Sequence, residues 1–325
     1  MLRREFLQTV GATSCSLLAG SALAQGIPKG PIRILVGFAP GGGSDVLARV
    51  IAPKLSAVWN TQVIVENRPG ATGMIAAEYV AKSAPDGLTL LLANLNTHAL
   101  APSLFPHVPY DIHKDFAPIV HIGSTPNILV GNTHQGPKSV AELVALCKSK
   151  PGMISFGSAG NGSIQHLALE LFKVATGINA IHVPYKGSGA MLTDLISGQI
   201  NYSFDTMPSS TAHIQNGKLV PLAQTQKVRA KSYPNVPTME EAGYPGYEVG
   251  FWYGLVGPRK LPAAIVQQMN EDMNKVLAMP DVVDRFERFG TGDGGGSPQK
   301  LAGMIETDAK KWAKVIKDAD VKPDA

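Results

Sequence analysis

Four loops rich in glycine and small polar residues are the places in this sequence where a ligand could be held. They span residues 38–45, 67–73, 157–163 and 184–189. Each loop follows a short apolar run and precedes a helix-period pattern, which predicts a turn from a strand into a helix start. The first loop has three consecutive glycines beside Ser44, which is more than a turn alone requires.

The chemistry that such loops favour is the capture of an anion. The first-turn N–H groups of a helix lack partners inside the helix, and the helix dipole adds partial positive charge there. Glycine lets a ligand oxygen approach the backbone, and serine hydroxyls add donors. If loops 38–45 and 157–163 belong to different lobes, each would hold one carboxylate of a small diacid, or one end of a smaller anion, across a cleft.

Patterns for other chemistry are missing from the sequence. Residues 38–45 lack the P-loop spacing G-x-x-x-x-G-K-[ST], and residues 157–160 do not form the nucleophile elbow G-x-S-x-G. The eight histidines show no H-x-x-x-H or H-E-x-x-H pair. We therefore expect no cofactor, no metal and no catalysis. Two alternatives stay open: a ligand-sensing subunit for a signalling partner, and a secreted serine hydrolase that uses Ser44 or Ser163.

Four side chains near the loops could contribute to the site, and two of them, His166 and Asp205, have two interpretations each. His166 follows Ser163 by three residues and either reaches a ligand or caps and packs its helix. Asp205, at the end of a predicted strand, either forms a turn or accepts a hydrogen bond from a ligand ammonium or a water. Asp45 is expected to serve the helix start, since its carboxylate disfavours a bare anion unless water intervenes. Tyr185 is expected to form a wall of the cleft.

The elements that must position these loops alternate along the chain. Val- and Ile-rich runs such as 32–36 and 89–93 predict strands, and helix-period patterns lie between them. The alternation restarts at residue 119, which predicts an α/β protein of two lobes, each a mostly parallel sheet flanked by helices. We assign residues 25–123 plus 230–325 to lobe 1 and residues 124–229 to lobe 2.

The first 24 residues predict export. Arg3 and Arg4 precede an apolar stretch of small residues over 10–23, and Ala22-Leu23-Ala24 offers a cleavage site. Residues 1–24 are therefore expected to be a signal peptide, read by the twin-arginine or the general route. The mature protein is expected in the periplasm.

Charge, hydropathy and cysteine content exclude several properties of the mature protein. The net charge of the 325-residue chain is +4, aromatic residues are few, and basic residues form no long block, so we expect no nucleic-acid partner. No apolar run beyond the N-terminus approaches membrane length. Cys15 would leave with the signal peptide, and a single remaining cysteine, Cys147, cannot form an internal disulfide. We expect a monomer.

A family likeness runs through nearly the whole mature chain. It is carried by several short segments taken together and in order: FAPGGGSD at 38–45, VENRPGA at 65–71, APDG at 84–87, VPYKG at 183–187, and VPT at 236–238 followed by EAG at 241–243. In this combination the chain resembles the solute receptors of tripartite tricarboxylate transporters, also called Bug-type receptors. One departure is the strand Asn201-Tyr202-Ser203-Phe204, where relatives usually show Asp-Val-x-Phe; Asp205 itself matches.

The resemblance implies a periplasmic-binding-protein fold that closes like a flytrap on a carboxylate, namely a di- or tricarboxylate, an amino acid or an aromatic acid. It implies that loops 38–45 and 158–163 hold the ligand, partly through water, and that the ligand passes to a membrane permease of one large and one small subunit. The predicted ligand-binding residues are Phe38, Ala39, Pro40, Gly41, Gly42, Gly43, Ser44, Asp45, Ala71, Thr72, Ser158, Ala159, Gly160, Asn161, Ser163, His166, Tyr185 and Asp205.

Overall fold

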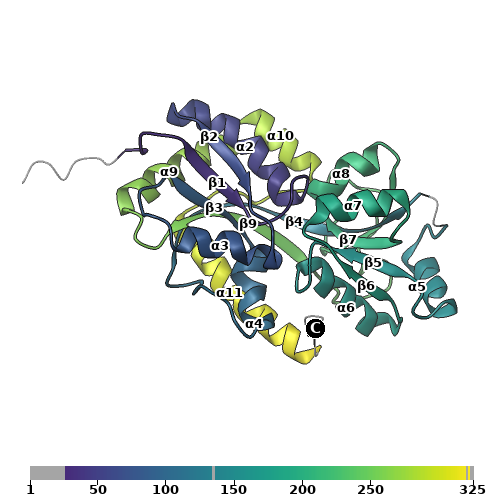
Figure 1. Ribbon diagram of the computed structural model, residues 1–325. Coiled ribbons are helices and arrows are strands. Elements are labelled where there is room, and N and C mark those ends of the chain that lie inside the picture. Colours follow the sequence, from purple (N-terminus) through teal and green to yellow (C-terminus); the bar gives the residue numbers. More distant parts are fainter. Residues whose placement is uncertain (1–25, 134–135, 320, 323–325) are drawn as a thin grey trace, which may run out of the picture.

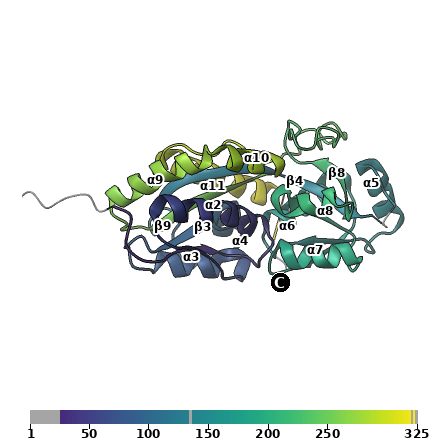
Figure 2. The ribbon, with the colours of Figure 1, turned by 90° about the horizontal axis from the view of Figure 1, so that it is seen from above.

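Two lobes lie side by side in the computed structural model, which describes residues 26–133, 136–319 and 321–322 (Figure 1). The predicted signal peptide, residues 1–24, lies outside the described residues. Seen from above, the lobes form an elongated body in which strand β4 (Phe116–Asn132) passes from one lobe to the other (Figure 2). Among the described helices, none is long and apolar enough to cross a bilayer.

The first lobe contains a five-stranded sheet in the order β2-β1-β3-β9-β4. Strand β1 pairs in parallel with β2 and β3, whereas β9 pairs antiparallel with β3 and β4. The strands are β1 (Ile32–Val36), β2 (Val63–Asn67), β3 (Thr89–Asn94), β9 (Gly250–Pro258) and the first part of β4. The helices are α2 (Gly43–Trp59), α3 (Met74–Ala81), α4 (Ala101–Leu104), α9 (Ala263–Leu277), α10 (Pro280–Arg288) and α11 (Pro298–Asp318).

The second lobe repeats this plan. Strand β5 pairs in parallel with β6 and β7, and the second part of β4 pairs antiparallel with β7 and β8. The strands are β5 (Ser155–Ser158), β6 (Ile181–Pro184), β7 (Tyr202–Thr206) and β8 (Leu219–Gln224). The helices are α5 (Val140–Ser149), α6 (Ile164–Thr176), α7 (Ser188–Ser197) and α8 (Met207–Gln215).

Each sheet is mostly parallel, as the sequence predicts, but includes one antiparallel strand. Four of the five strands in each lobe run in the same direction, and the exception is β9 in the first sheet and β4 in the second. The cause is the connection between the lobes, because a chain that leaves the first lobe along β4 must return in the opposite direction. The α/β, two-lobed fold class is confirmed.

The crossover region is held by a small set of backbone contacts. Strand β4 pairs with β9 as far as Pro126, and from Asn127 onward it pairs with β7. The Thr225 N–H donates to the Asn127 carbonyl at 3.0 Å, and the Val249 N–H donates to the Thr225 carbonyl at 2.9 Å. Thr225 therefore bridges the outgoing chain at Asn127 and the returning chain at Val249, and a hinge would sit where these two segments pass between the lobes.

Segment 230–249, which the sequence analysis grouped with lobe 1, packs on the second lobe instead. Tyr233 and Val236 belong to the same apolar cluster as Ile128 of β4, and the Gln224 side chain donates to the Tyr233 and Val236 carbonyls at 2.8 and 2.7 Å. We therefore propose that the return to lobe 1 begins near Gly250, where β9 starts.

Cys147 is a residue of helix α5, and its side chain is fully buried. Burial raises the pKa of its thiol to about 11, so the group stays protonated and unreactive at neutral pH. The residue therefore serves as a small apolar side chain in the core of the second lobe.

Candidate functional site

A small cavity lies between the two lobes, at the carboxyl ends of β3 and β7. Its volume is about 20 Å³, which is room for roughly one water molecule. The lining contains no Lys, Arg or His and consists of Phe38, Gly42, Gly43, Ser44, Asn94, Asn96, Ala159, Gln165, Ser188, Thr206, Phe251 and Tyr253. The cavity is therefore polar but holds no charged side chain.

Three helices begin at this cavity. Helix α2 of the first lobe follows Gly42, helix α7 of the second follows Gly187, and helix α8 follows Thr206. Gly42 and Gly187 have no side chain that could cap a helix, and the Thr206 hydroxyl bonds Ser209 Oγ rather than a first-turn N–H. The starts of α2 and α7 therefore face one small volume with their first-turn residues, and α8 adds the positive end of its dipole through Thr206, an arrangement that suits a carboxylate.

Each glycine of the first loop has its own structural reason. Gly41 has φ +84°, a left-handed conformation that other residues rarely adopt. Gly42 lies against Ser188 of the opposite lobe, and a Cβ there would be 3.7 Å from the Ser188 nitrogen. A Cβ on Gly43 would lie 2.3 Å from the Tyr253 hydroxyl and 2.5 Å from Thr206 Oγ1, so a side chain at this position would fill the cavity.

Asp45 supports the first loop from below rather than facing the cavity. Its carboxylate accepts hydrogen bonds from Gly41 N–H at 3.0 Å, from Asn67 Nδ2 at 2.9 Å, and from Arg49. Burial alone would raise the pKa of Asp45, but the bonds from Arg49, Gly41 and Asn67 outweigh it and lower that pKa. The carboxylate is thus neutralised by Arg49 before it can repel an anion.

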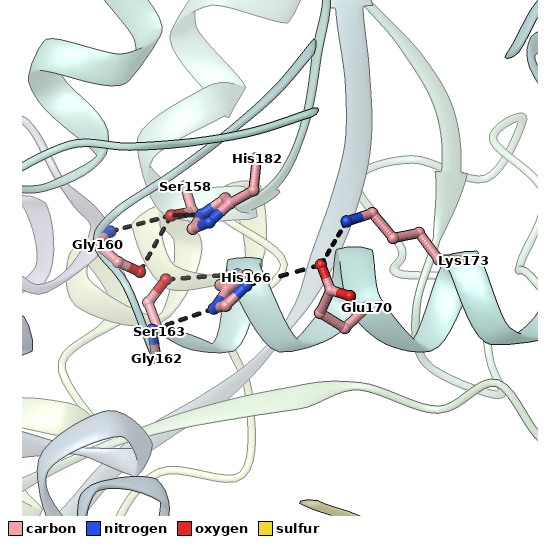
Figure 3. Close-up of polar contacts among 8 residues, drawn as sticks. All are labelled: Ser158, Gly160, Gly162, Ser163, His166, Glu170, Lys173 and His182. Carbon is pink, nitrogen blue, oxygen red and sulfur yellow. Dashed lines mark hydrogen bonds and ion pairs between the residues drawn. The ribbon is translucent and has the colours of Figure 1, made fainter. Parts of the chain in front are cut away.

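The start of helix α6, after the third loop, is already occupied. Ser163 Oγ accepts from the His166 N–H at 3.4 Å, and Asn96 Oδ1 of the first lobe accepts from the Ile164 N–H at 2.9 Å. Ser158 Oγ contacts His182 Nε2 at 2.7 Å and also bonds the Gly160 backbone (Figure 3). Side-chain oxygens therefore satisfy donors that the sequence analysis had assigned to a ligand.

His166 packs beneath this loop, with only 1% of its surface exposed. Its Nδ1 accepts from the Gly162 N–H at 3.2 Å, its ring stacks on His182 with centroids 3.8 Å apart, and its Nε2 lies 3.6 Å from Glu170 Oε1 (Figure 3). Burial raises the pKa of Glu170, but hydrogen bonds with His166 and Lys173 prevail and lower it to about 2. His166 thus holds the loop and does not line the cavity.

An open groove of about 700 Å³ adjoins the cavity on the outside. Phe38 and Ala159 line both spaces and form the wall between them. Within the 3-10 turn η1 (Ala71–Gly73), Ala71 and Thr72 take left-handed φ values of 46° and 51°, a conformation that costs energy and concentrates at ligand clamps.

The lobes touch directly across this groove. Thr72 Oγ1 donates to the Asn161 carbonyl at 2.6 Å, and the Ala39 N–H donates to the Lys186 carbonyl at 3.1 Å. The structure therefore shows the closed arrangement of the two lobes.

Sequence comparison assigns the chain to a known group of proteins. The model of the tripartite tricarboxylate transporter family receptors matches residues 47–321. The chain belongs to this receptor family. Protein BugT of Bordetella pertussis is 35% identical over 318 residues, which cover 98% of this chain and 96% of BugT.

Two solved structures of R. palustris proteins are similar to the receptor. Rpa4515, described with adipate, is 35% identical with a TM-score of 0.88 and covers 91% of this chain and 99% of its own. MatC from Rhodopseudomonas palustris, described with bound malate, is 31% identical with a TM-score of 0.84 and covers 89% of this chain and 99% of its own.

The predicted site residues fall into three groups in the receptor. The cavity is lined by Phe38, Gly42, Gly43, Ser44 and Ala159, and the outer groove by Ala71, Thr72, Gly160, Asn161 and Tyr185. The others support these surfaces without lining either of them: Ala39, Pro40, Gly41, Asp45, Ser158, Ser163, His166 and Asp205. Tyr185 directs its hydroxyl to Asp194 at 2.8 Å.

Seven cavity residues were not predicted. They are Asn94, Asn96, Gln165, Ser188, Thr206, Phe251 and Tyr253. Ser188 lies in the fourth glycine-rich loop, so its position was visible in the sequence, and Asn94 and Thr206 end strands, which is where open α/β sheets place ligands. Phe251 and Tyr253 alternate along β9 and gave no signal of their own, because apolar alternation also describes an ordinary core strand.

Proposed function

We propose that this protein is a periplasmic solute receptor that captures a small carboxylate between its lobes without reacting with it. Backbone N–H groups and neutral side chains would supply the binding energy, with no cationic clamp. The receptor would then pass its ligand to a membrane permease of one large and one small subunit. The adipate and malate of the two R. palustris structures support a carboxylate with a short carbon chain.

The observation that carries this proposal is the meeting of three helix starts at one cavity without a charged lining residue. A carboxylate placed there would accept from first-turn N–H groups of α2 and α7, and the dipole of α8 would add to the attraction. Because the cavity holds about one water, a diacid requires the lobes to separate before it enters. The paired crossings near residues 127 and 250 are the place for that hinge.

The local geometry favours binding over hydrolysis at both candidate serines. Ser44 Oγ accepts from Asn94 Nδ2 at 3.2 Å, and Ser163 Oγ caps its own helix. His166, the histidine nearest to Ser163 in sequence, turns its Nδ1 to the Gly162 N–H. A serine hydrolase needs a base within hydrogen-bond reach of its nucleophile. His166 does not provide such a base for Ser163.

The proposal is tested by thermal unfolding of the chain from residue 25, first unfolded and refolded to release any bound ligand. Succinate, malate, glutarate and adipate are each added at millimolar concentration, and the corresponding diamides serve as neutral controls. A ligand at 100 times its Kd adds about 2.7 kcal/mol of stability, which raises the Tm by several degrees. If every acid leaves the Tm where its diamide leaves it, carboxylate capture is excluded.

A further inference from the structure

Gln165 differs from the other amide side chains of the cavity because its oxygen is an acceptor that no described group uses. The residue lies in the first turn of α6, is 4% exposed and lines the cavity. Its Oε1 is buried and has no hydrogen-bond partner within the described part of the chain. The amide oxygens of Asn94 and Asn96, by contrast, accept from the Thr97 and Ile164 N–H groups.

The orientation of the Gln165 amide follows from a chain of hydrogen bonds that starts at Asp205. Asp205 is fully buried, and its carboxylate accepts from the hydroxyls of Ser188 at 2.6 Å, Ser209 at 2.5 Å and Ser210 at 2.7 Å. A serine hydroxyl has a single proton. The Ser188 oxygen can therefore only accept from any further neighbour.

That neighbour is Gln165, whose Nε2 donates to Ser188 Oγ at 3.4 Å. The amide cannot turn over, because its oxygen would then face an oxygen with no proton to give. Oε1 is consequently the end of the amide that is directed away from Ser188. The cavity thus contains an amide oxygen of fixed orientation that no described group uses, in addition to the unpaired Tyr253 hydroxyl.

We propose that Gln165 makes the receptor selective for dicarboxylates that carry a hydroxyl on the carbon chain, and that Asp205 is the positioning residue that fixes the Gln165 amide through Ser188. This inference rests on the proposed function. A plain diacid would satisfy the helix starts but leave Oε1 buried and unpaired, and an unpaired buried acceptor costs binding free energy. A ligand hydroxyl donates to it and removes that cost.

A hydroxyl fits this position better than an ammonium group. Three helix dipoles direct their positive ends to the cavity, and their field favours anions and opposes cations. The Asp205 carboxylate lies behind Ser188, accepts from three serine hydroxyls and does not itself line the cavity. Aspartate, the amino analogue of malate, is therefore expected to bind less tightly than malate.

The experiment is isothermal titration calorimetry on the mature receptor with matched pairs of acids: succinate and malate, glutarate and 2-hydroxyglutarate, adipate and 2-hydroxyadipate. Methylsuccinate controls for added volume, and aspartate tests the ammonium group. In the pair of best length we expect the hydroxylated acid to bind about tenfold more tightly, or about 1.4 kcal/mol.

Two variants test the residues themselves. Gln165→Met removes the acceptor at similar volume and should bring the paired Kd values to within about threefold, with affinity for the plain acid retained. Asp205→Asn offers a donor to Ser188, frees its proton for Gln165 Oε1 and should reduce the hydroxyl preference similarly. Gln267→Met, at an exposed position of α9, is the control and should keep the full preference.

The outcomes separate the two proposals. Equal binding of plain and hydroxylated acids by the wild-type receptor overturns the selectivity while leaving carboxylate capture intact. A tenfold preference that survives in Gln165→Met overturns the role of Gln165. No binding of any of the six acids removes the proposed function, and the selectivity with it.

Discussion

Two helix starts that look alike in the sequence behave in opposite ways. Helix α2 begins after a glycine-rich loop at Gly43 with no side-chain cap, and its first turn lines the cavity. Helix α6 begins after another glycine-rich loop, but Ser163 and Asn96 occupy its N–H groups. A glycine- and serine-rich turn therefore predicts a helix start, whereas its capacity to bind an anion depends on which side-chain oxygens reach it first.

The two helix starts also differ in what they contact. The α2 start belongs to the ligand cavity, whereas the α6 start joins the lobes, because Asn96 of the first lobe caps a helix of the second. With the contact between Thr72 and Asn161, this bond forms only when the lobes are closed. The backbone N–H groups of these two helix starts therefore serve different tasks, although the Gln165 side chain of α6 also lines the cavity.

The largest expected effect comes from Gly43→Ala, which fills the cavity at the α2 start. The glycine has helical geometry, so alanine suits the backbone, but its Cβ would lie 2.3 Å from the Tyr253 hydroxyl and 2.5 Å from Thr206 Oγ1. We expect carboxylate affinity to fall at least about 100-fold, or about 2.7 kcal/mol, by calorimetry. Gly303→Ala, in α11 with nothing within 4 Å of the new Cβ, is the control, and equal affinity of both variants would contradict the assignment.

The second effect tests the support beneath the α6 loop. The pKa of Glu170 is lowered to about 2 despite burial, by His166 and Lys173. A lowered carboxyl pKa contributes stability above the unfolded value near 4.5 that is lost as the pH falls toward 2. Glu170→Gln should therefore lower the free energy of unfolding by roughly 2 kcal/mol at pH 7 and by much less at pH 3.

Urea unfolding at both pH values measures this difference. Glu78→Gln, which removes an exposed ion pair with Lys82, is the matched control and should cost less than about 0.5 kcal/mol. A loss of stability in Glu170→Gln that is the same at pH 7 and pH 3 would show that its charge is not responsible.

The third effect distinguishes the two caps of α6. Ser163→Ala removes a cap within one lobe, so we expect a loss of about 1 kcal/mol of stability and little change in affinity. Asn96→Ala removes a cap that exists only on closure, so affinity should fall about fivefold, although Asn96 also lines the cavity. Small-angle scattering with saturating ligand should show a larger open population in Asn96→Ala alone, and equal scattering from both variants would remove the division of tasks.

The smallest effect is the response to salt. The cavity lining has no charged side chain, and buried dipoles are screened far less than exposed charges. Raising NaCl from 50 to 500 mM should therefore change the Kd of the best acid by less than about twofold. A tenfold or larger loss of affinity at 500 mM NaCl would show that exposed cationic side chains govern ligand binding.

The sequence predicted the α/β alternation and the location of the first loop, since glycine spacing and hydrophobic periodicity are local signals. It did not predict the antiparallel strand in each sheet, because the pairing of β4 with β9 joins segments more than 100 residues apart. The sequence also placed His166 and Asp205 in the site but left open whether each contacts the ligand or has a structural role. In the structure one packs beneath a loop and the other orients Ser188.

By itself, the sequence determined where helices could begin and which of those starts have room for a ligand, because these properties depend on residues next to each other in the chain. Only the tertiary structure decided which starts remain uncapped. The Asn96 oxygen reaches Ile164 from 68 positions away, and the orientation of Gln165 depends on Asp205, 40 positions further along the chain. Hydrogen-bond satisfaction is a property of neighbours in space, so a single sequence does not contain it in readable form.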